Sequence, residues 1–137
     1  MWLARLTGAD GSEGRIVDLH RWCVEQYFHP RMGGGTSIKL VLPAVWQGNT
    51  ALQAHPWFRG LPEEPYSALK AVDAAGQTLP AVRDGVAAQG AYIEMLHGPH
   101  SGDPSHRAAL RRQLSEYCKL DTLAMVIIWR HWADRCT

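Results

Sequence analysis

Four stretches of the chain space their hydrophobic residues as helices do. They cover residues 21–28, 38–42, 85–96 and 104 to about 133. A polar residue suited to cap a helix N-terminus precedes the last three: Thr36 or Ser37, Asp84 and Asp103. The sequence therefore predicts four helices, of which the last is long, with a candidate joint near Leu120.

Prolines indicate where the first two helices end or bend, and large apolar residues indicate which face of the third is buried. His29-Pro30 ends the first, and Pro43 makes the second short or bent. In the third, the helical period predicts a buried face made of four residues. These are Val86, Tyr92, Ile93 and Leu96.

Outside the helices, the pattern is weaker. Residues 15–19 are predicted to form a short buried strand, and residues 1–6 the end of a helix. Residues 47–80 contain prolines and scattered aromatics without a sustained period, so we expect a long irregular loop with one small helix near 67–72. The predicted fold is α/β, dominated by helices, in a single domain over residues 1–137.

Composition adds little about function. The chain is 46% hydrophobic and 20% charged, as in an ordinary globular domain, and its formal charge of +1 gives no broad basic surface for nucleic acid. Its three cysteines are widely spaced and form no Cys-x-x-Cys pair, which favours a reducing compartment. Without a leader-like segment or an apolar run of roughly 20 residues, the chain is expected in the cytoplasm.

The most informative polar residues are Tyr117 and Asp121, which lie four positions apart in the last predicted helix. This spacing places a phenol and a carboxylate on the same helix face. From spacing alone, a structural explanation is the commoner one: Tyr117 packs its ring in the core, and Asp121 caps a second helix after the joint.

Five segments in order resemble an uncharacterised bacterial family. They are residues 15–19, 27–30, 37–44, 84–88 and 117–125, and the resemblance extends from Arg15 to Trp132. The family carries a ribonuclease H-like DEDDy 3′–5′ exonuclease domain at the C-terminal end of larger proteins, often after a RecB-like nuclease module. In such enzymes a Tyr-x-x-x-Asp pair is the third catalytic motif.

The resemblance implies that Asp121 binds Mg²⁺ or Mn²⁺ and that Tyr117 orients the attacking water. Two-metal hydrolysis requires several carboxylates, and the family's opening Asp-x-Glu motif does not occur in this sequence. The chain thus resembles the C-terminal portion of the nuclease, an incomplete ribonuclease H-like domain without its first strands. We expect it to be inactive unless a complementing N-terminal chain or a homo-oligomer supplies the other carboxylates.

The alternative function is a non-catalytic module derived from the same fold, which binds nucleic acid or another protein. Exposed apolar surface would favour a partner. The end of the last helix, with Ile127, Ile128, Trp129 and Trp132, is apolar around much of its circumference and would be uncovered if the first strands were absent.

Other candidate residues have commoner structural explanations. Asp18 and Asp84 are expected to cap helices, and Lys39 to be a solvated lysine, although it could contact phosphate. His97, His100 and His106 have a spacing that allows a metal site, but an exposed loop is the stronger expectation. Arg107, Arg111 and Arg112 could follow a nucleic-acid backbone, but are expected to form a solvated face.

Overall fold

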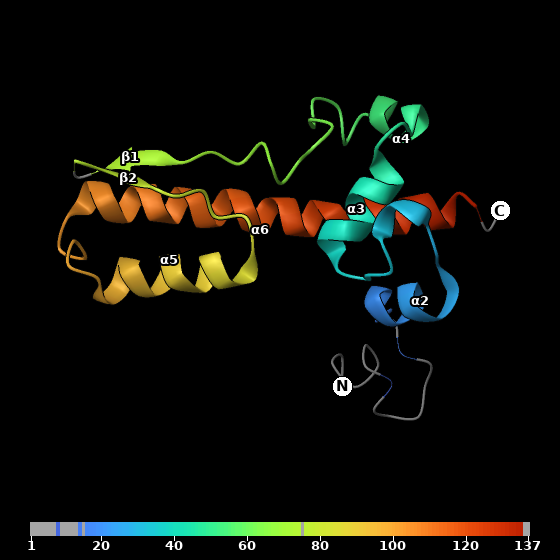
Figure 1. The fold of residues 1–137 in the computed structure, drawn as a ribbon, viewed down its shortest axis with the longest axis horizontal. Coiled ribbons are helices and arrows are strands. Elements are labelled where there is room, and N and C mark those ends of the chain that lie inside the picture. Colours follow the sequence, from blue (N-terminus) through green and yellow to red (C-terminus); the bar gives the residue numbers. More distant parts are fainter. Residues whose placement is uncertain (1–7, 9–13, 15, 75, 136–137) are drawn as a thin grey trace.

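The structure, a computed structural model, describes residues 8, 14, 16–74 and 76–135. Six helical elements and two strands follow one another along this part of the chain (Figure 1). They are α2 (Leu19–Gln26), the 3-10 helix η1 (Pro30–Met32), α3 (Ile38–Trp46), α4 (Thr50–Ala54), β1 (Val72–Ala74), β2 (Gln77–Leu79), α5 (Gly85–His97) and α6 (Pro104–Ala133).

The long helix α6 is the axis of the molecule (Figure 1). Its first half contacts α5 and the β hairpin, and α3 packs against its second half, close to α2 and η1. The two ends of α6 therefore belong to two hydrophobic clusters. The larger cluster joins α3 to the second half of α6. The smaller cluster lies where the hairpin and α5 meet the first half of α6.

The larger cluster contains the most deeply buried side chains. Leu42, Ala124 and Ile127 are fully buried, and Trp46 of α3 is 1% exposed. The indole of Trp46 meets the ring of Phe58 edge to face, and its Nε1 donates to the carbonyl oxygen of Pro62 at 3.0 Å. The irregular segment after α4 is thereby attached to the core.

The small sheet is an antiparallel hairpin with Val72 opposite Leu79 and Ala74 opposite Gln77. Leu79 is buried against Met95 of α5 and Leu110 of α6. The hairpin is too short to be stable alone, so this packing holds it in place.

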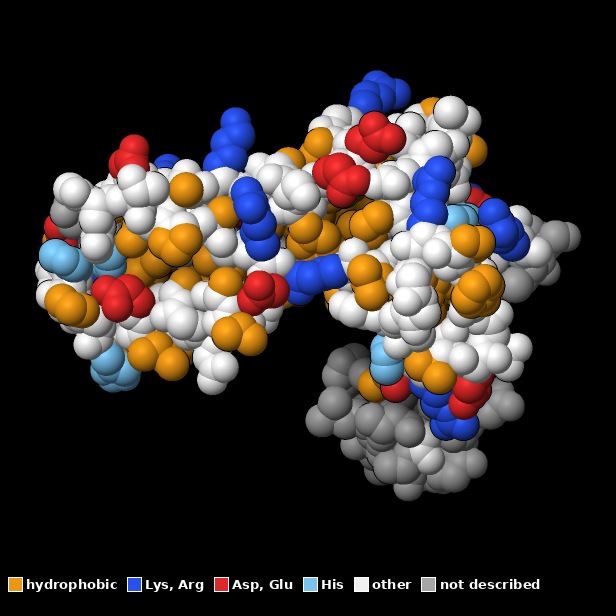
Figure 2. Space-filling view, viewed as in Figure 1, with side chains coloured by type: hydrophobic (Ala, Val, Ile, Leu, Met, Phe, Trp, Pro, Cys, Tyr) orange, Lys and Arg blue, Asp and Glu red, His pale blue; other side chains and the backbone are white. Residues whose placement is uncertain are grey.

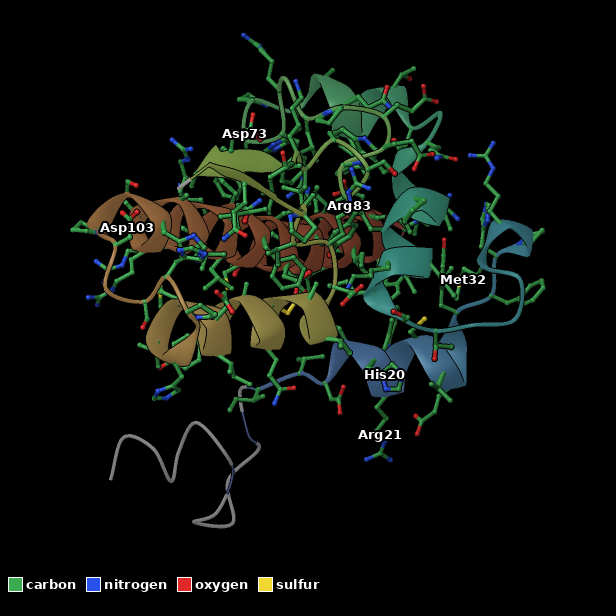
Figure 3. The ribbon with its side chains drawn as sticks, turned by 60° about the vertical axis from the view of Figure 1, so that its left-hand side comes forward. His20, Arg21, Met32, Asp73, Arg83 and Asp103 are labelled. Carbon is green, nitrogen blue, oxygen red and sulfur yellow. The ribbon has the colours of Figure 1, made fainter. Side chains whose placement is uncertain are left out.

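Local capping explains where the helices begin. The carboxylates of Asp18, Asp84 and Asp103 accept backbone N–H groups at the starts of α2, α5 and α6, and the Ser37 hydroxyl does the same for α3. Asp103 is followed by Pro104 in the first turn of α6 (Figure 3). The predicted capping roles of these four residues are confirmed.

Several predictions about local structure are wrong. Residues 16–18 form no buried strand, since Ile16 and Val17 are 61% and 63% exposed and Leu19 begins α2. Arg15 and residues 1–6 lie outside the described residues. The predicted loop 47–80 contains α4 and both strands. Residues 67–72 form no helix: 67–68 lie in a turn, 69–71 are irregular, and Val72 begins β1. Helix α6 is continuous through Leu120, without the candidate joint.

The predicted buried face of α5 is also wrong. Val86, Tyr92, Ile93 and Leu96 are exposed by 41% or more, and the helix turns Met95, Ala87, Ala88 and Ala91 inward. Small side chains on the inner face allow the α5 backbone to approach its neighbours closely. Hydrophobic side chains consequently lie on the surface along α5, at the lower left of the molecule in Figure 2.

The helix-dominated α/β class is confirmed, with the two-stranded hairpin as the sheet of the described region. Among the described helices, none has the combined length and apolar composition needed to cross a bilayer.

Candidate functional site

Tyr117 and Asp121 lie one turn apart in the middle of α6. Tyr117 is 6% exposed and Asp121 is partly buried. The prediction that both side chains share one helix face is confirmed, since they lie four positions apart in a continuous helix. Asp121 caps no second helix, because α6 continues beyond it.

A second phenol comes from the irregular segment between α4 and β1. The Tyr66 hydroxyl donates a hydrogen bond of 2.6 Å to Oδ1 of Asp121. Turn hydrogen bonds hold the Tyr66 backbone, and the Arg83 guanidinium donates to the carbonyl oxygens of Ser67 and Leu69 just beyond it (Figure 3). The segment that carries Tyr66 is thus fixed on both sides.

Lys39, from the first turn of α3, completes the cluster. Its Nζ donates to the Tyr117 hydroxyl at 3.3 Å. The same atom lies 5.3 Å from the ring centroids of both Tyr66 and Tyr117, within the range of a cation–π interaction. Lys39 is partly buried beside the two phenol rings, so the prediction of a solvated lysine holds only in part. We call Lys39, Tyr66, Tyr117 and Asp121 the tyrosine–lysine cluster.

Both phenols of the cluster resist ionisation. Burial, followed by hydrogen bonding with Asp121 and the negative charges of Asp121 and Asp84, raises the pKa of Tyr117 to about 12. Burial is also the main reason why the pKa of Tyr66 is raised, and Asp121 adds to it. At neutral pH both hydroxyls therefore keep their protons, and Tyr66 donates its proton to the carboxylate.

The cluster combines one ammonium group, two neutral phenols and one carboxylate. These groups can bind and orient a polar ligand such as a phosphate. They do not by themselves fit a two-metal centre, because no group of three or more His, Cys, Asp or Glu side chains suitable for a metal occurs within the described residues. A metal at Asp121 would need ligands from elsewhere.

The predicted histidine loop is only partly a loop. His97 and His100 are exposed, whereas His106, in the first turns of α6, is fully buried. Its Nε2 lies 3.5 Å from Glu94, and its ring centroid lies 5.3 Å from that of His100. These residues form no metal-binding group in the described structure.

The three arginines at the start of α6 form a solvated face, as expected from the sequence. Arg107, Arg111 and Arg112 are exposed on α6 and line a shallow surface depression together with Glu116 and Lys119. Glu116 and Lys119 form a surface ion pair of 3.2 Å. The residues that line the depression include none of the four residues of the tyrosine–lysine cluster.

Sequence reasoning missed Tyr66 and gave little weight to Lys39. Tyr66 occurs in a segment without periodicity, so no local signal marks it. Lys39 does lie within one of the segments that carry the family resemblance, residues 37–44, and this was the available signal.

Comparison with protein-family models, with curated proteins and with solved structures finds no match for this chain. The resemblance to the DEDDy exonucleases therefore remains a prediction.

Proposed function

We propose that this chain is the C-terminal portion of a metal-dependent 3′–5′ exonuclease that acts on DNA or RNA. The observation that carries the proposal is the joint position of Tyr117 and Asp121 on one face of α6, with Tyr66 and Lys39 against them. By resemblance, Asp121 is a metal ligand and Tyr117 orients the attacking water. Both roles require side chains held in place, and the contacts of the cluster supply that order.

The cofactor implied by the resemblance is Mg²⁺ or Mn²⁺. Asp121 would supply one carboxylate ligand, and the others would come from outside the described residues, through a complementing N-terminal chain or a second copy. Such a partner would also complete a ribonuclease H-like domain. An apolar hollow lies between α2, α3 and the end of α6. It is lined by Val17, Ile38, Met125 and Ile128 among others, and exposed apolar surface of this kind supports the proposal that a partner binds there.

A cytoplasmic location is part of the proposal. Cys23 and Cys118 are free thiols in the structure, which supports the reducing compartment that the sequence predicts. Cys136 lies outside the described residues.

One observation favours the alternative, a non-catalytic module that binds nucleic acid or protein. Oδ1 of Asp121 already accepts a short hydrogen bond from Tyr66, and the ammonium group of Lys39 lies on the neighbouring phenol. A carboxylate satisfied in this way needs no metal ion to be stable.

A nuclease assay combined with metal titration separates the two functions. We would follow 3′-labelled single-stranded DNA and RNA in Mg²⁺ or Mn²⁺, and record Mn²⁺ broadening of amide NMR signals near residue 121. The wild-type chain, Asp121→Asn and Glu116→Gln would be compared, because Glu116 is an exposed carboxylate on the same helix.

Hydrolysis that Asp121→Asn abolishes supports the exonuclease, as does selective Mn²⁺ broadening that disappears in Asp121→Asn alone. If both hydrolysis and Asp121-dependent broadening are absent, the chain holds no metal at Asp121, and this outcome favours the binding module.

A further inference from the structure

Lys39 has hydrogen-bonding capacity that its surroundings do not use. An ammonium group has three N–H donors. Within the described residues, the ammonium group of Lys39 forms no salt bridge, and the Tyr117 hydroxyl is its one hydrogen-bond acceptor. Two tyrosine rings hold the charged group in place, yet rings accept no strong hydrogen bond. A partly buried cation with free donors is suited to an anionic ligand.

The hydrogen bonds of the cluster have a defined direction. Lys39 donates to the oxygen of Tyr117, so the Tyr117 hydroxyl keeps its own proton as a donor. Tyr66 donates to Oδ1 of Asp121. This oxygen is thus occupied by a phenol, and within the described residues no carboxylate forms a salt bridge with the ammonium group of Lys39.

We propose that Lys39 binds a non-bridging oxygen of the phosphate of a terminal nucleotide, and that a nucleoside 5′-monophosphate is the smallest ligand that the cluster holds. The proposal rests on the proposed exonuclease, whose product is such a nucleotide, and adds a substrate-binding residue to Tyr117 and Asp121. Lysine commonly binds phosphate as a point charge. Because the ammonium group already lies between the two rings, little side-chain entropy remains to be lost on binding.

The test is an NMR titration of the whole chain, with EDTA present, using thymidine 5′-monophosphate, thymidine and inorganic phosphate. Lys39→Met keeps the length and apolar contacts of the side chain but removes its charge. Lys119→Met is the matched control, since Lys119 is an exposed lysine on α6. Lys39→Arg restores a charge, and melting temperatures show that each variant is folded.

We expect the monophosphate to shift signals of α3 and of residues near 117, and Lys39→Met to bind it about tenfold more weakly, as loss of a charge-assisted hydrogen bond predicts. Lys119→Met should bind like the wild type, and Lys39→Arg should recover part of the affinity. Binding of the monophosphate but not of thymidine would show that the phosphate is recognised. Weaker or absent binding of inorganic phosphate would show that the nucleoside contributes as well.

Equal affinity of Lys39→Met and Lys119→Met would overturn the inference, as would binding of thymidine alone or no binding by the wild type. Mn²⁺ broadening, measured on EDTA-free samples of the same proteins, shows which idea has failed. Asp121-dependent broadening without phosphate binding removes only the role of Lys39, whereas absence of both also counts against a metal site at Asp121.

Discussion

The hydroxyl of Tyr66 and the carboxylate of Asp121, 55 residues apart in sequence, share a hydrogen bond of 2.6 Å. This contact ties the irregular segment before the hairpin to the middle of α6. It also gives the carboxylate a neutral donor on one oxygen. Stability and site geometry therefore depend on the same pair of side chains.

Replacing Tyr66 by Phe removes this donor while keeping the ring. We expect the free energy of unfolding to fall by roughly 1–2 kcal/mol, since a hydrogen bond to a charged group is lost but Asp121 is only partly buried. Urea unfolding followed by circular dichroism measures the change. Tyr92→Phe is the control, because Tyr92 is 54% exposed on α5. Equal stability of the two variants would contradict the assigned contact.

Alkaline pH should destabilise the protein through its buried phenols. A tyrosine in an unfolded chain ionises near pH 10. The pKa of Tyr117 is raised to about 12 by burial and by Asp121, so between about pH 10 and 12 the unfolded chain releases a proton that the folded chain keeps. The free energy of unfolding must then decrease as pH rises through this window.

Urea unfolding at several pH values above 9 would measure this decrease, and absorbance of the phenolate would follow ionisation directly. Tyr117→Phe should lower the slope, since one of the raised phenols is gone. An unchanged slope in the variant would mean that Tyr117 ionises normally in the folded state.

Sequence alone predicted the helix starts well because capping is local. Asp84 and Asp103 each accept N–H groups within the next three residues, so the signal and the structure occupy the same short segment. The spacing of Tyr117 and Asp121 was equally local, and α6 places them as expected.

Long-range packing was harder to predict. In α5 the larger residues Val86 and Ile93 suggested a buried face, but Ala87 and Ala91 face the core instead, since close helix packing favours small side chains there. Tyr66 reaches Asp121 only through the tertiary fold, and no periodicity precedes it. The sequence thus predicted the two site residues on α6, Tyr117 and Asp121. It did not predict that the fold brings Tyr66 and Lys39 to them.

His131 offers a test at acid pH. The side-chain oxygen of Asn49 accepts from the N–H of Leu52, so its amide nitrogen is the atom 3.2 Å from Nδ1 of His131. Nδ1 must then be an acceptor, and the neutral imidazole carries its proton on Nε2, 3.4 Å from the Tyr27 hydroxyl. Protonation of Nδ1 would break the contact with Asn49.

The pKa of His131 is lowered below its usual 6.5, first by burial and then by the positive charges of Arg135 and His29. Below about pH 6.5 the unfolded chain therefore binds a proton that the folded chain binds only at lower pH. The free energy of unfolding then decreases as pH falls. We expect His131→Gln to lose less stability than the wild type between pH 7.5 and 5.5, measured by urea unfolding. His97→Gln, at an exposed position, controls for removal of a histidine. A wild-type pH response in His131→Gln would assign the effect to another group.

Trp46 and Trp132 are both buried but differ in the state of their indole N–H. Trp46 donates to the carbonyl oxygen of Pro62, whereas Nε1 of Trp132 has no hydrogen-bond partner within the described residues. Trp46→Phe should cost roughly 1–3 kcal/mol, because it leaves a smaller ring and an unpaired carbonyl. Trp132→Phe removes an unsatisfied donor and should cost less. Chemical unfolding of both variants gives the comparison, and a larger loss for Trp132→Phe would show that its ring packing outweighs the unpaired N–H.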